Sequence, residues 1–125
     1  MTNISLLLLV GLFIIKHFIV DFLWQTPYQF KNKHILGHPG GIIHALLHAV
    51  TSWVILGMVF SFFSTTVIIA VIAELFIHYF VDFMKMNFNI RFNYTPSNSP
   101  IFWYMLGFDQ LLHYCTYLGM IYYII

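Results

Sequence analysis

The stretch AELFIHYFVDFMK, residues Ala73–Lys85, decides the fold of this chain. Within an otherwise apolar and aromatic run, Glu74, His78 and Asp82 recur at every fourth position. On an α-helix this spacing places the three side chains one above another on a single face. Two carboxylates and an imidazole are costly in so apolar a segment unless other groups pair with them or a cation binds them. The stretch therefore predicts a buried helix whose polar face meets partners from the rest of the chain.

Three other apolar segments carry polar residues at the same spacing and supply such partners. They contain His17, Asp21 and Gln25 near the N-terminus, then His44 and His48, and finally Asp109 and His113. The sequence also repeats itself, because HFIVDF at residues 17–22 matches HYFVDF at residues 78–83. Each match is followed by an apolar segment that carries its own pair of polar residues four positions apart. The pattern predicts two duplicated helical hairpins.

The composition places the chain among membrane proteins. Of its 125 residues, 61% are hydrophobic, 20% are aromatic and 7% are charged, whereas soluble domains have roughly 25% charged residues. The mean hydropathy is +0.86. The lipid bilayer is the expected partner, no nucleic-acid partner is expected, and the sequence leaves an oligomer open. The single cysteine, Cys115, excludes an internal disulfide and a thiolate metal cluster.

The apolar runs are long enough to cross a bilayer. Four of them reach about 20 residues, the length that spans a hydrocarbon core of roughly 30 Å. We therefore expect an all-α polytopic membrane protein, a four-transmembrane-helix bundle that forms a single domain over residues 1–125. The expected helices are 4–25, 42–62, 66–86 and 100–125, with longer loops at 26–41 and 87–99.

The basic residues indicate the orientation in the membrane. Lys31, Lys33, Lys85 and Arg91 all lie in or beside the two longer loops, and cytoplasmic loops of membrane proteins are enriched in Lys and Arg. We therefore expect these loops in the cytoplasm and both termini outside, in a bacterial inner membrane. The polar motifs occupy the helix halves next to the same loops, so the site that they form should open toward the cytoplasm.

The polar motifs have the composition of a metal site. All 4 acidic residues and five of the 7 histidines belong to them, and nitrogen and oxygen ligands without thiolates suit Zn²⁺, Mn²⁺ or Fe²⁺. Four carboxylates with neutral imidazoles carry about −4, which two divalent ions would neutralise. The expected ligands are His17, Asp21, His44, His48, His78, Asp82, Asp109 and His113. Glu74 would bridge the ions or act as a base, and Gln25 and Gln110 would hold water or substrate.

Four short motifs carry a resemblance to a known group of proteins. They are HFIVDFLWQ at residues 17–25, HALLHA at 44–49, HYFVDF at 78–83 and DQLLHY at 109–114. Together they resemble an uncharacterised family of small integral-membrane proteins from bacteria and phages. The resemblance covers nearly the whole chain and implies that the motif residues matter, without naming a reaction. A more distant similarity is to membrane-bound metal-dependent hydrolases with His and Asp motifs on transmembrane helices.

The leading hypothesis is a membrane-embedded, metal-dependent hydrolase that acts on a phosphoester or lipid-linked substrate at the cytoplasmic membrane face. The residues expected to attract its anionic substrate are Lys16, Lys31, Lys33, Lys85 and Arg91. The same His and Asp residues could instead relay metal ions or protons in a translocator, although the outer helix halves lack ionisable residues. Bis-histidine haem binding is a third reading, but it leaves four buried acids unexplained. His–Asp pairs that only join the helices are the structural alternative.

Overall fold

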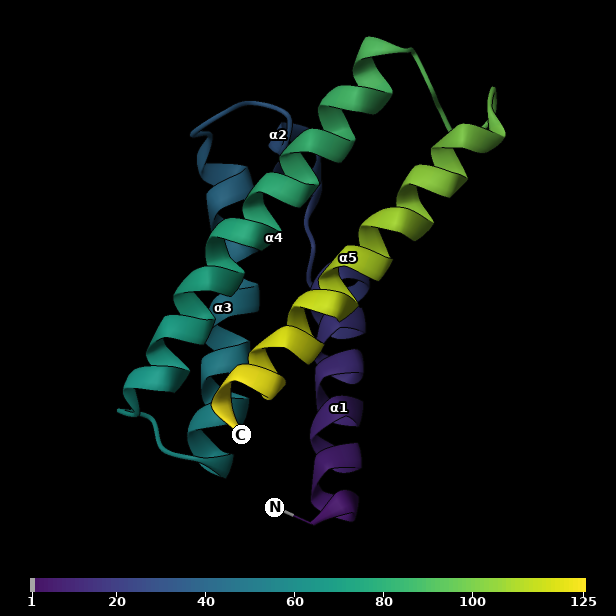
Figure 1. Cartoon of the computed structure of the whole chain (residues 1–125). Helices are drawn as coiled ribbons and strands as arrows, with labels where there is room; N and C mark the ends of the chain where they lie inside the picture. Colours follow the sequence, from purple (N-terminus) through teal and green to yellow (C-terminus); the bar gives the residue numbers. More distant parts are fainter. Residues whose placement is uncertain (1) are drawn as a thin grey trace.

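The computed structural model of the chain describes residues 2–125 and shows an all-helical protein. The described residues form five α-helices and one π-helix. They are α1 (Asn3–Phe18), the π-helix η1 (Ile19–Leu23), α2 (Pro27–Asn32), α3 (Pro39–Val59), α4 (Thr65–Arg91) and α5 (Pro100–Ile124). Helix α4 packs against α3 and α5, and α1 also contacts both of these helices (Figure 1). The prediction of an all-α fold is confirmed.

Three helical segments in the described residues are long and apolar enough to cross a membrane. They are Asn3–Leu23, which joins α1 to η1, Pro39–Val59 (α3) and Thr65–Arg91 (α4). Such helices indicate a membrane protein in contact with lipid. Helix α5, which carries Asp109, Gln110 and His113, is not among them. The fourth span and the duplicated hairpins therefore remain predictions.

The connection after η1, expected as a loop, contains the further helix α2. The Thr26 hydroxyl accepts a hydrogen bond from the Gln29 N–H, and the Gln29 side-chain oxygen accepts one from the Thr26 N–H. This reciprocal cap, together with Pro27 at the first helical position, stabilises a helix start. Lys33 follows directly at the C-terminal end of α2, where its side chain is buried. The loop prediction is therefore wrong at α2.

Two other helix boundaries differ from the expected ones. Helix α3 begins at Pro39, because the His38 ring accepts a hydrogen bond from the Gly40 N–H (3.0 Å) and caps the helix. Helix α4 continues through Arg91 and takes up the first residues of the expected loop. There the Asn87 amide donates to two backbone carbonyl groups, one of them in the α2–α3 connection. Asn residues often compete with the backbone and end helices, but this one is satisfied without breaking α4.

A π-helical turn interrupts the first membrane segment at Asp21. The Trp24 N–H donates to the carbonyl of Ile19 (2.9 Å), five residues earlier, whereas an α-helix pairs residues four apart. Such turns often occur at functional sites, because the extra residue changes the direction of the side chains around it. Here Val20 and Asp21 are both buried. The turn thus helps to place the Asp21 carboxylate inside the bundle.

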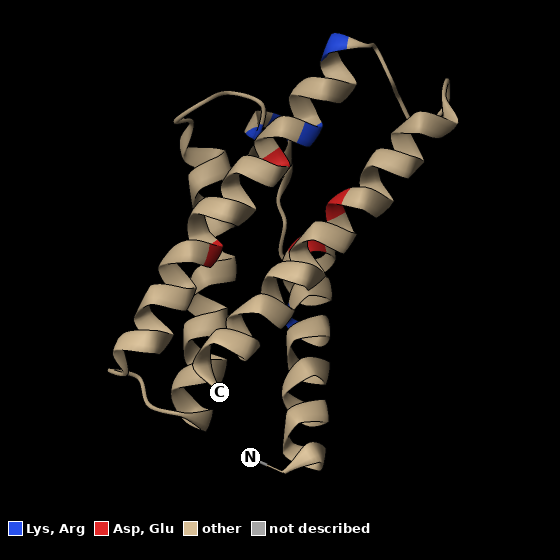
Figure 2. Ribbon diagram, viewed as in Figure 1, with Lys and Arg blue, Asp and Glu red and all other residues tan. Residues whose placement is uncertain are grey.

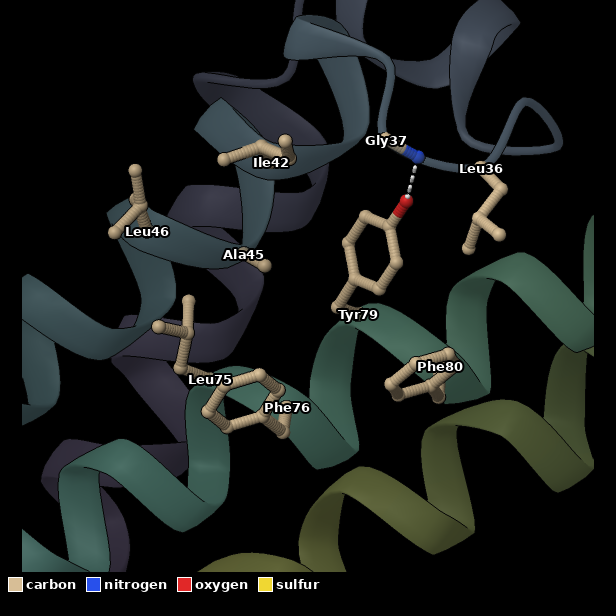
Figure 3. A pocket seen from close by; sticks show the side chains of 9 residues that line it. All are labelled: Leu36, Gly37, Ile42, Ala45, Leu46, Leu75, Phe76, Tyr79 and Phe80. Carbon is tan, nitrogen blue, oxygen red and sulfur yellow. Dashed lines mark hydrogen bonds between the residues drawn. The ribbon is translucent and has the colours of Figure 1, made fainter.

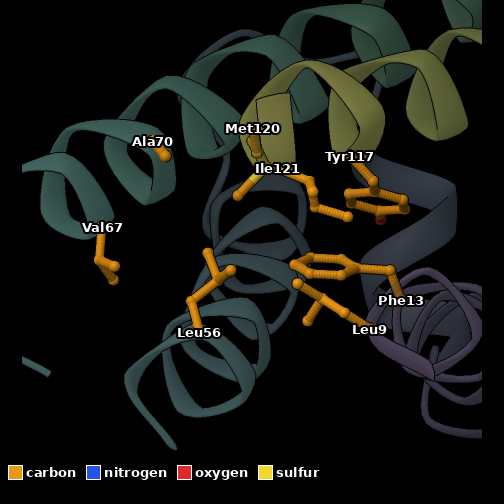
Figure 4. Close-up of a cluster of buried hydrophobic side chains, with 8 residues drawn as sticks. All are labelled: Leu9, Phe13, Leu56, Val67, Ala70, Tyr117, Met120 and Ile121. Atoms are coloured by element: carbon orange, nitrogen blue, oxygen red, sulfur yellow. The ribbon is translucent and has the colours of Figure 1, made fainter. Parts of the chain in front are cut away.

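The interior changes from apolar to polar along the bundle. Near the ends of α1 and α5 that carry the chain termini, apolar side chains from four helices fill the interior (Figure 4). This apolar cluster consists of Leu9, Phe13, Leu56, Val67, Ala70, Tyr117, Met120 and Ile121. The acidic and basic residues lie at mid-height of the bundle or nearer to α2 and the α4–α5 connection (Figure 2). The polar part of the interior is therefore closed toward the termini by a packed apolar layer.

Candidate metal centre

Each of the four long helical segments buries polar side chains at four-residue spacing. They are Lys16, His17 and Asp21 from α1 and η1, His44, His48 and Ser52 from α3, Glu74, His78 and Asp82 from α4, and Asp109, His113 and Tyr117 from α5. Ser52 and Tyr117 were not predicted, although each follows a motif histidine by four positions. Extending the four-residue pattern by one more turn would have found both. Groups buried this deeply need partners, because burial removes them from bulk water.

Four of these side chains form a compact ligand group, which consists of Asp21, His44, His48 and His78. One ligand atom from each lies within 4.8 Å of the other three. The Asp21 Oδ1 atom is 3.0 Å from His44 Nε2 and 2.9 Å from His48 Nε2. The Nε2 atoms of His44 and His78 are 3.3 Å apart. A tetrahedral ion with bonds of about 2.0–2.1 Å places its ligand atoms about 3.3 Å from one another. This buried ligand group could therefore hold a metal ion.

A second group, His78, Asp82 and His113, also offers ligand atoms within 4.8 Å of one another. It shares His78 with the first group, and the His78 ring stacks between those of His48 and His113 at 3.8 and 3.9 Å between centroids. The His78 Nε2 atom is 3.3 Å from His44 Nε2 and 3.5 Å from Asp82 Oδ2. The two groups therefore share the His78 side chain, and one nitrogen lone pair of its ring can bind one ion.

Lysine side chains neutralise most of the buried acids. Lys33 Nζ lies 2.7 Å from Asp82 Oδ2, and Lys85 Nζ lies 2.9 Å from Asp109 Oδ2. Lys16 pairs with Glu74. Among the described ion pairs, Asp21 is therefore the one acid that contacts only imidazoles. Four acids and three lysines leave a charge of about −1 when the imidazoles are neutral. The predicted charge of −4, and the argument from it for two divalent ions, are wrong because they counted no buried lysine.

His17 supports the first ligand group from outside it. Its Nε2 atom lies 2.8 Å from the Gln110 side-chain oxygen and 3.0 Å from Asp21 Oδ2. Two acceptors beside Nε2 place the proton there, so Nδ1 accepts a hydrogen bond from the Tyr117 hydroxyl at 2.8 Å. His17 belongs to neither ligand group in the described residues. It contacts Asp21, and its assignment as a metal ligand remains a prediction.

Glu74 pairs with Lys16 one helical turn deeper than the ligand groups. Lys16 Nζ lies 2.6 Å from Glu74 Oε1 and donates to the Ser52 hydroxyl at 2.7 Å. These contacts hold the ammonium among protein groups, and the predicted contact of Lys16 with a substrate remains a prediction. Glu74 lies outside both ligand groups and forms an ion pair with Lys16. Its predicted role as a bridging ligand or a base remains a prediction.

Three further predicted residues surround the ligand groups without joining them. The Asp109 carboxylate is 3.4 Å from His113 Nε2. The Gln110 amide donates to Asp21 Oδ2 at 3.3 Å and to Asp109 Oδ2 at 3.1 Å. The Gln25 amide donates to the Asp21 backbone carbonyl at 2.7 Å, and its own side-chain oxygen is buried without a partner among the described residues. These side chains hold the carboxylates in position, as groups around metal ligands commonly do.

A cavity of about 160 Å³ adjoins the first ligand group. The polar side chains that line it are Asp21, Gln25, Lys33, Lys85, Asn89 and Gln110. Asn89 was not predicted, because it lies in the segment expected as a loop, and its buried side-chain oxygen has no partner among the described residues. Lys31 and Arg91 are exposed and lie outside this lining. Of the five predicted anion-binding residues, the structure therefore brings Lys33 and Lys85 to the cavity.

The family of the chain follows from comparison with known proteins. A family model described as "Protein of unknown function (DUF3307)" matches residues 8–125. The chain belongs to this family. The predicted membership of an uncharacterised family is confirmed, whereas the similarity to metal-dependent hydrolases remains a prediction. No curated protein and no solved structure matches the chain.

Proposed function

We propose that this protein is a membrane-embedded, metal-dependent hydrolase that acts on a phosphoester or lipid-linked substrate. The observation that carries the proposal is the position of Asp21, which belongs to the buried ligand group and also lines the polar cavity. An ion held by the group would face a cavity that also contains the side chains of Lys33 and Lys85. Ammonium groups next to a Lewis acid suit an anionic substrate.

The cavity residues support hydrolysis of a phosphate ester. An ion held by Asp21 and the three histidines would supply Lewis-acid chemistry, which polarises a phosphoryl oxygen and acidifies a water molecule. The water oxygen would add to phosphorus while the ester P–O bond breaks, and the departing oxygen would take up the proton that the water releases. Lys33 and Lys85 would stabilise the negative charge that develops on the phosphoryl oxygens. The amides of Gln25, Asn89 and Gln110 would orient the phosphate by hydrogen bonds.

We propose one ion per chain, bound in the first ligand group. That group contains Asp21, the acid without a lysine partner in the described ion pairs. The second group surrounds Asp82, whose oxygens lie 2.7 Å from Lys33 Nζ and 3.6 Å from Lys85 Nζ. Two ammonium groups so near oppose a further cation. Three imidazoles and one carboxylate fit Zn²⁺, with Mn²⁺ and Fe²⁺ as the alternatives.

We also propose that α5 is a fourth membrane span and that the chain is a single domain. The terminal ends of α1 and α5 lie at the same end of the bundle as the α3–α4 turn (Figure 1), which requires an even number of crossings. The opposite end, with α2 and the α4–α5 connection, carries basic residues (Figure 2). Lys33 lies at the C-terminal end of α2, and Lys85 and Arg91 lie in the C-terminal part of α4. The positive-inside rule makes that end cytoplasmic, so the site would open to the cytoplasm of a bacterial cell.

The two other predicted functions fit the geometry less well. A translocator needs a path from both membrane faces, but the apolar cluster and the Lys16–Glu74 pair fill the interior toward the termini (Figure 4). A bis-histidine haem needs a flat slot between two imidazoles. Here the His78 ring stacks directly on those of His48 and His113.

A pair of lysine substitutions tests the hydrolase proposal. Purified protein loaded with Zn²⁺ is assayed against a panel of phosphomonoesters and phosphodiesters. We expect turnover by the unaltered protein and a rise in KM of about tenfold or more for Lys33→Met, which removes a charged contact to the substrate. Lys31→Met is the matched control, because Lys31 is exposed near the same end of α2 and does not line the cavity. Absence of turnover with the metal bound, or equal effects of the two substitutions, would contradict the proposal.

A further inference from the structure

A mainly apolar groove of about 170 Å³ lies between α4 and α5. Its apolar lining consists of Val81, Met84, Phe88, Met105, Phe108 and Leu112. Met84 and Phe108 are 67% and 53% exposed. Exposed apolar side chains on a membrane helix face the hydrocarbon chains of the bilayer. The groove is therefore open sideways to lipid.

Lys85 connects this α4–α5 groove with the polar cavity, because it lines both. Its ammonium group pairs with Asp109, which also lines the groove. The four-carbon stem of a lysine can lie along apolar surface while its charged end stays among polar groups. A surface for a hydrocarbon chain and a surface for an anion thus meet at one side chain.

We infer that the substrate of this site is a phosphoryl lipid, with its phosphate in the polar cavity and its hydrocarbon chain in the α4–α5 groove. The inference rests on the proposed hydrolase function and names the substrate class. The lipid would enter sideways from the bilayer, so that its phosphate reaches Lys85 and then the ligand group without crossing the apolar cluster. A water-soluble phosphoester would occupy the cavity alone and bind less tightly, because it leaves the groove without a chain.

A second apolar cleft, between α3 and α4, offers a matched comparison (Figure 3). It is larger, about 340 Å³, and Leu75 and Phe76 form part of its wall. At its edge the Tyr79 hydroxyl accepts a hydrogen bond from the Gly37 N–H (2.7 Å). Its lining within the described residues includes no charged side chain. This cleft therefore lacks the neighbouring anion site that distinguishes the α4–α5 groove.

Tryptophan substitutions that fill either the α4–α5 groove or the α3–α4 cleft test whether the groove binds the hydrocarbon chain. Leu112→Trp narrows the α4–α5 groove, and Leu75→Trp narrows the comparison cleft. KM is measured in mixed micelles for dipalmitoyl phosphatidic acid and for its dihexanoyl analogue. Leu112→Trp should raise KM for the long-chain lipid by about tenfold, because the indole displaces about two methylene groups of the lipid from the groove. The same substitution should change KM for the short-chain analogue much less. Leu75→Trp should change neither, and Met105→Trp repeats the test should Leu112→Trp fail to fold.

A binding measurement separates this inference from the proposed hydrolase function. Retention of dipalmitoyl phosphatidic acid by the purified protein is measured by native mass spectrometry, which needs no turnover. Retention that Leu112→Trp abolishes, without any hydrolysis, would support the α4–α5 groove as a lipid site and contradict the hydrolase. Hydrolysis of both lipids with KM values unaffected by Leu112→Trp and Met105→Trp would overturn the inference and leave the hydrolase standing.

Discussion

The buried ion pair of Lys16 and Glu74 yields a stability prediction whose size follows from its geometry. The charged atoms are 2.6 Å apart, and the two side chains are only 4% and 1% exposed. Lys16→Met roughly keeps the shape of the side chain but leaves the Glu74 carboxylate buried without its counter-charge. Removing one partner of a buried pair costs about 3–5 kcal/mol. We expect Lys16→Met to lower the free energy of unfolding by this amount.

The double variant Lys16→Met/Glu74→Leu should recover most of that loss, because apolar residues can replace a buried ion pair at little cost. Free energies of unfolding are measured by SDS titration in mixed micelles, and the full cycle of single and double variants gives the coupling energy. Lys31→Met, at an exposed position, is the control and should stay within about 0.5 kcal/mol of the unaltered protein. A cost of less than about 1 kcal/mol for Lys16→Met, or a double variant that loses the sum of both single losses, would refute this reasoning.

Three further predictions concern the metal and the helix contacts. Asp21→Asn removes the only carboxylate of the first ligand group, so Zn²⁺ affinity in competition with a chelator should fall by more than about 100-fold; an unchanged affinity would place the ion elsewhere. His17→Ala removes only a positioning contact and should weaken Zn²⁺ by about 10–100-fold at unchanged stoichiometry; complete loss of the ion would make His17 a ligand. Gly40→Ala brings a Cβ to 2.6 Å from the Tyr28 carbonyl oxygen and should cost about 1–3 kcal/mol. Gly11→Ala, with no atom within 4 Å of the added Cβ, should not destabilise the protein, and equal losses for both would contradict the packing of α2 on α3.

Local patterns were sufficient to predict the long helices and most of the polar residues that face inward from them. Long apolar runs predict membrane helices because a span must satisfy its own backbone hydrogen bonds. Four-residue spacing identified Glu74, His78 and Asp82 as one face of α4, since the period of an α-helix maps sequence positions directly onto a face. The structure shows all three buried on that face.

The roles of individual side chains were harder to predict, because they depend on neighbours that only helix packing supplies. The segments around His17 and His78 share the HxxxD motif, yet Gln110 and Tyr117 from α5 occupy both ring nitrogens of His17. His78 meets other imidazoles instead. The shared HxxxD motif therefore does not give His17 and His78 the same neighbours.

The buried position of Lys33 was missed because the start of helix α2 was not recognised from the sequence. Thr26, Pro27 and Gln29 form a recognisable helix start, which we read as part of a loop. Without α2, Lys33 was expected in a cytoplasmic loop, although its Nζ atom lies 2.7 Å from Asp82 Oδ2 inside the bundle. This single misplacement contributed to the overestimated negative charge and thus to the prediction of two metal ions.

The central claim, that Asp21, His44, His48 and His78 from three helical segments build one buried metal site, is tested most directly by counting metal ions per chain. Protein purified in mild detergent and dialysed against Zn²⁺ is analysed by mass spectrometry of the elements, alongside a His48→Ala variant whose helical content is checked by circular dichroism. We expect about one tightly bound ion per chain in the unaltered protein, and loss of that ion in the variant, since a structural or catalytic Zn²⁺ site needs its full set of ligands. An unaltered protein that binds no ion, or a folded His48→Ala variant that binds as much as the unaltered protein, would contradict the claim.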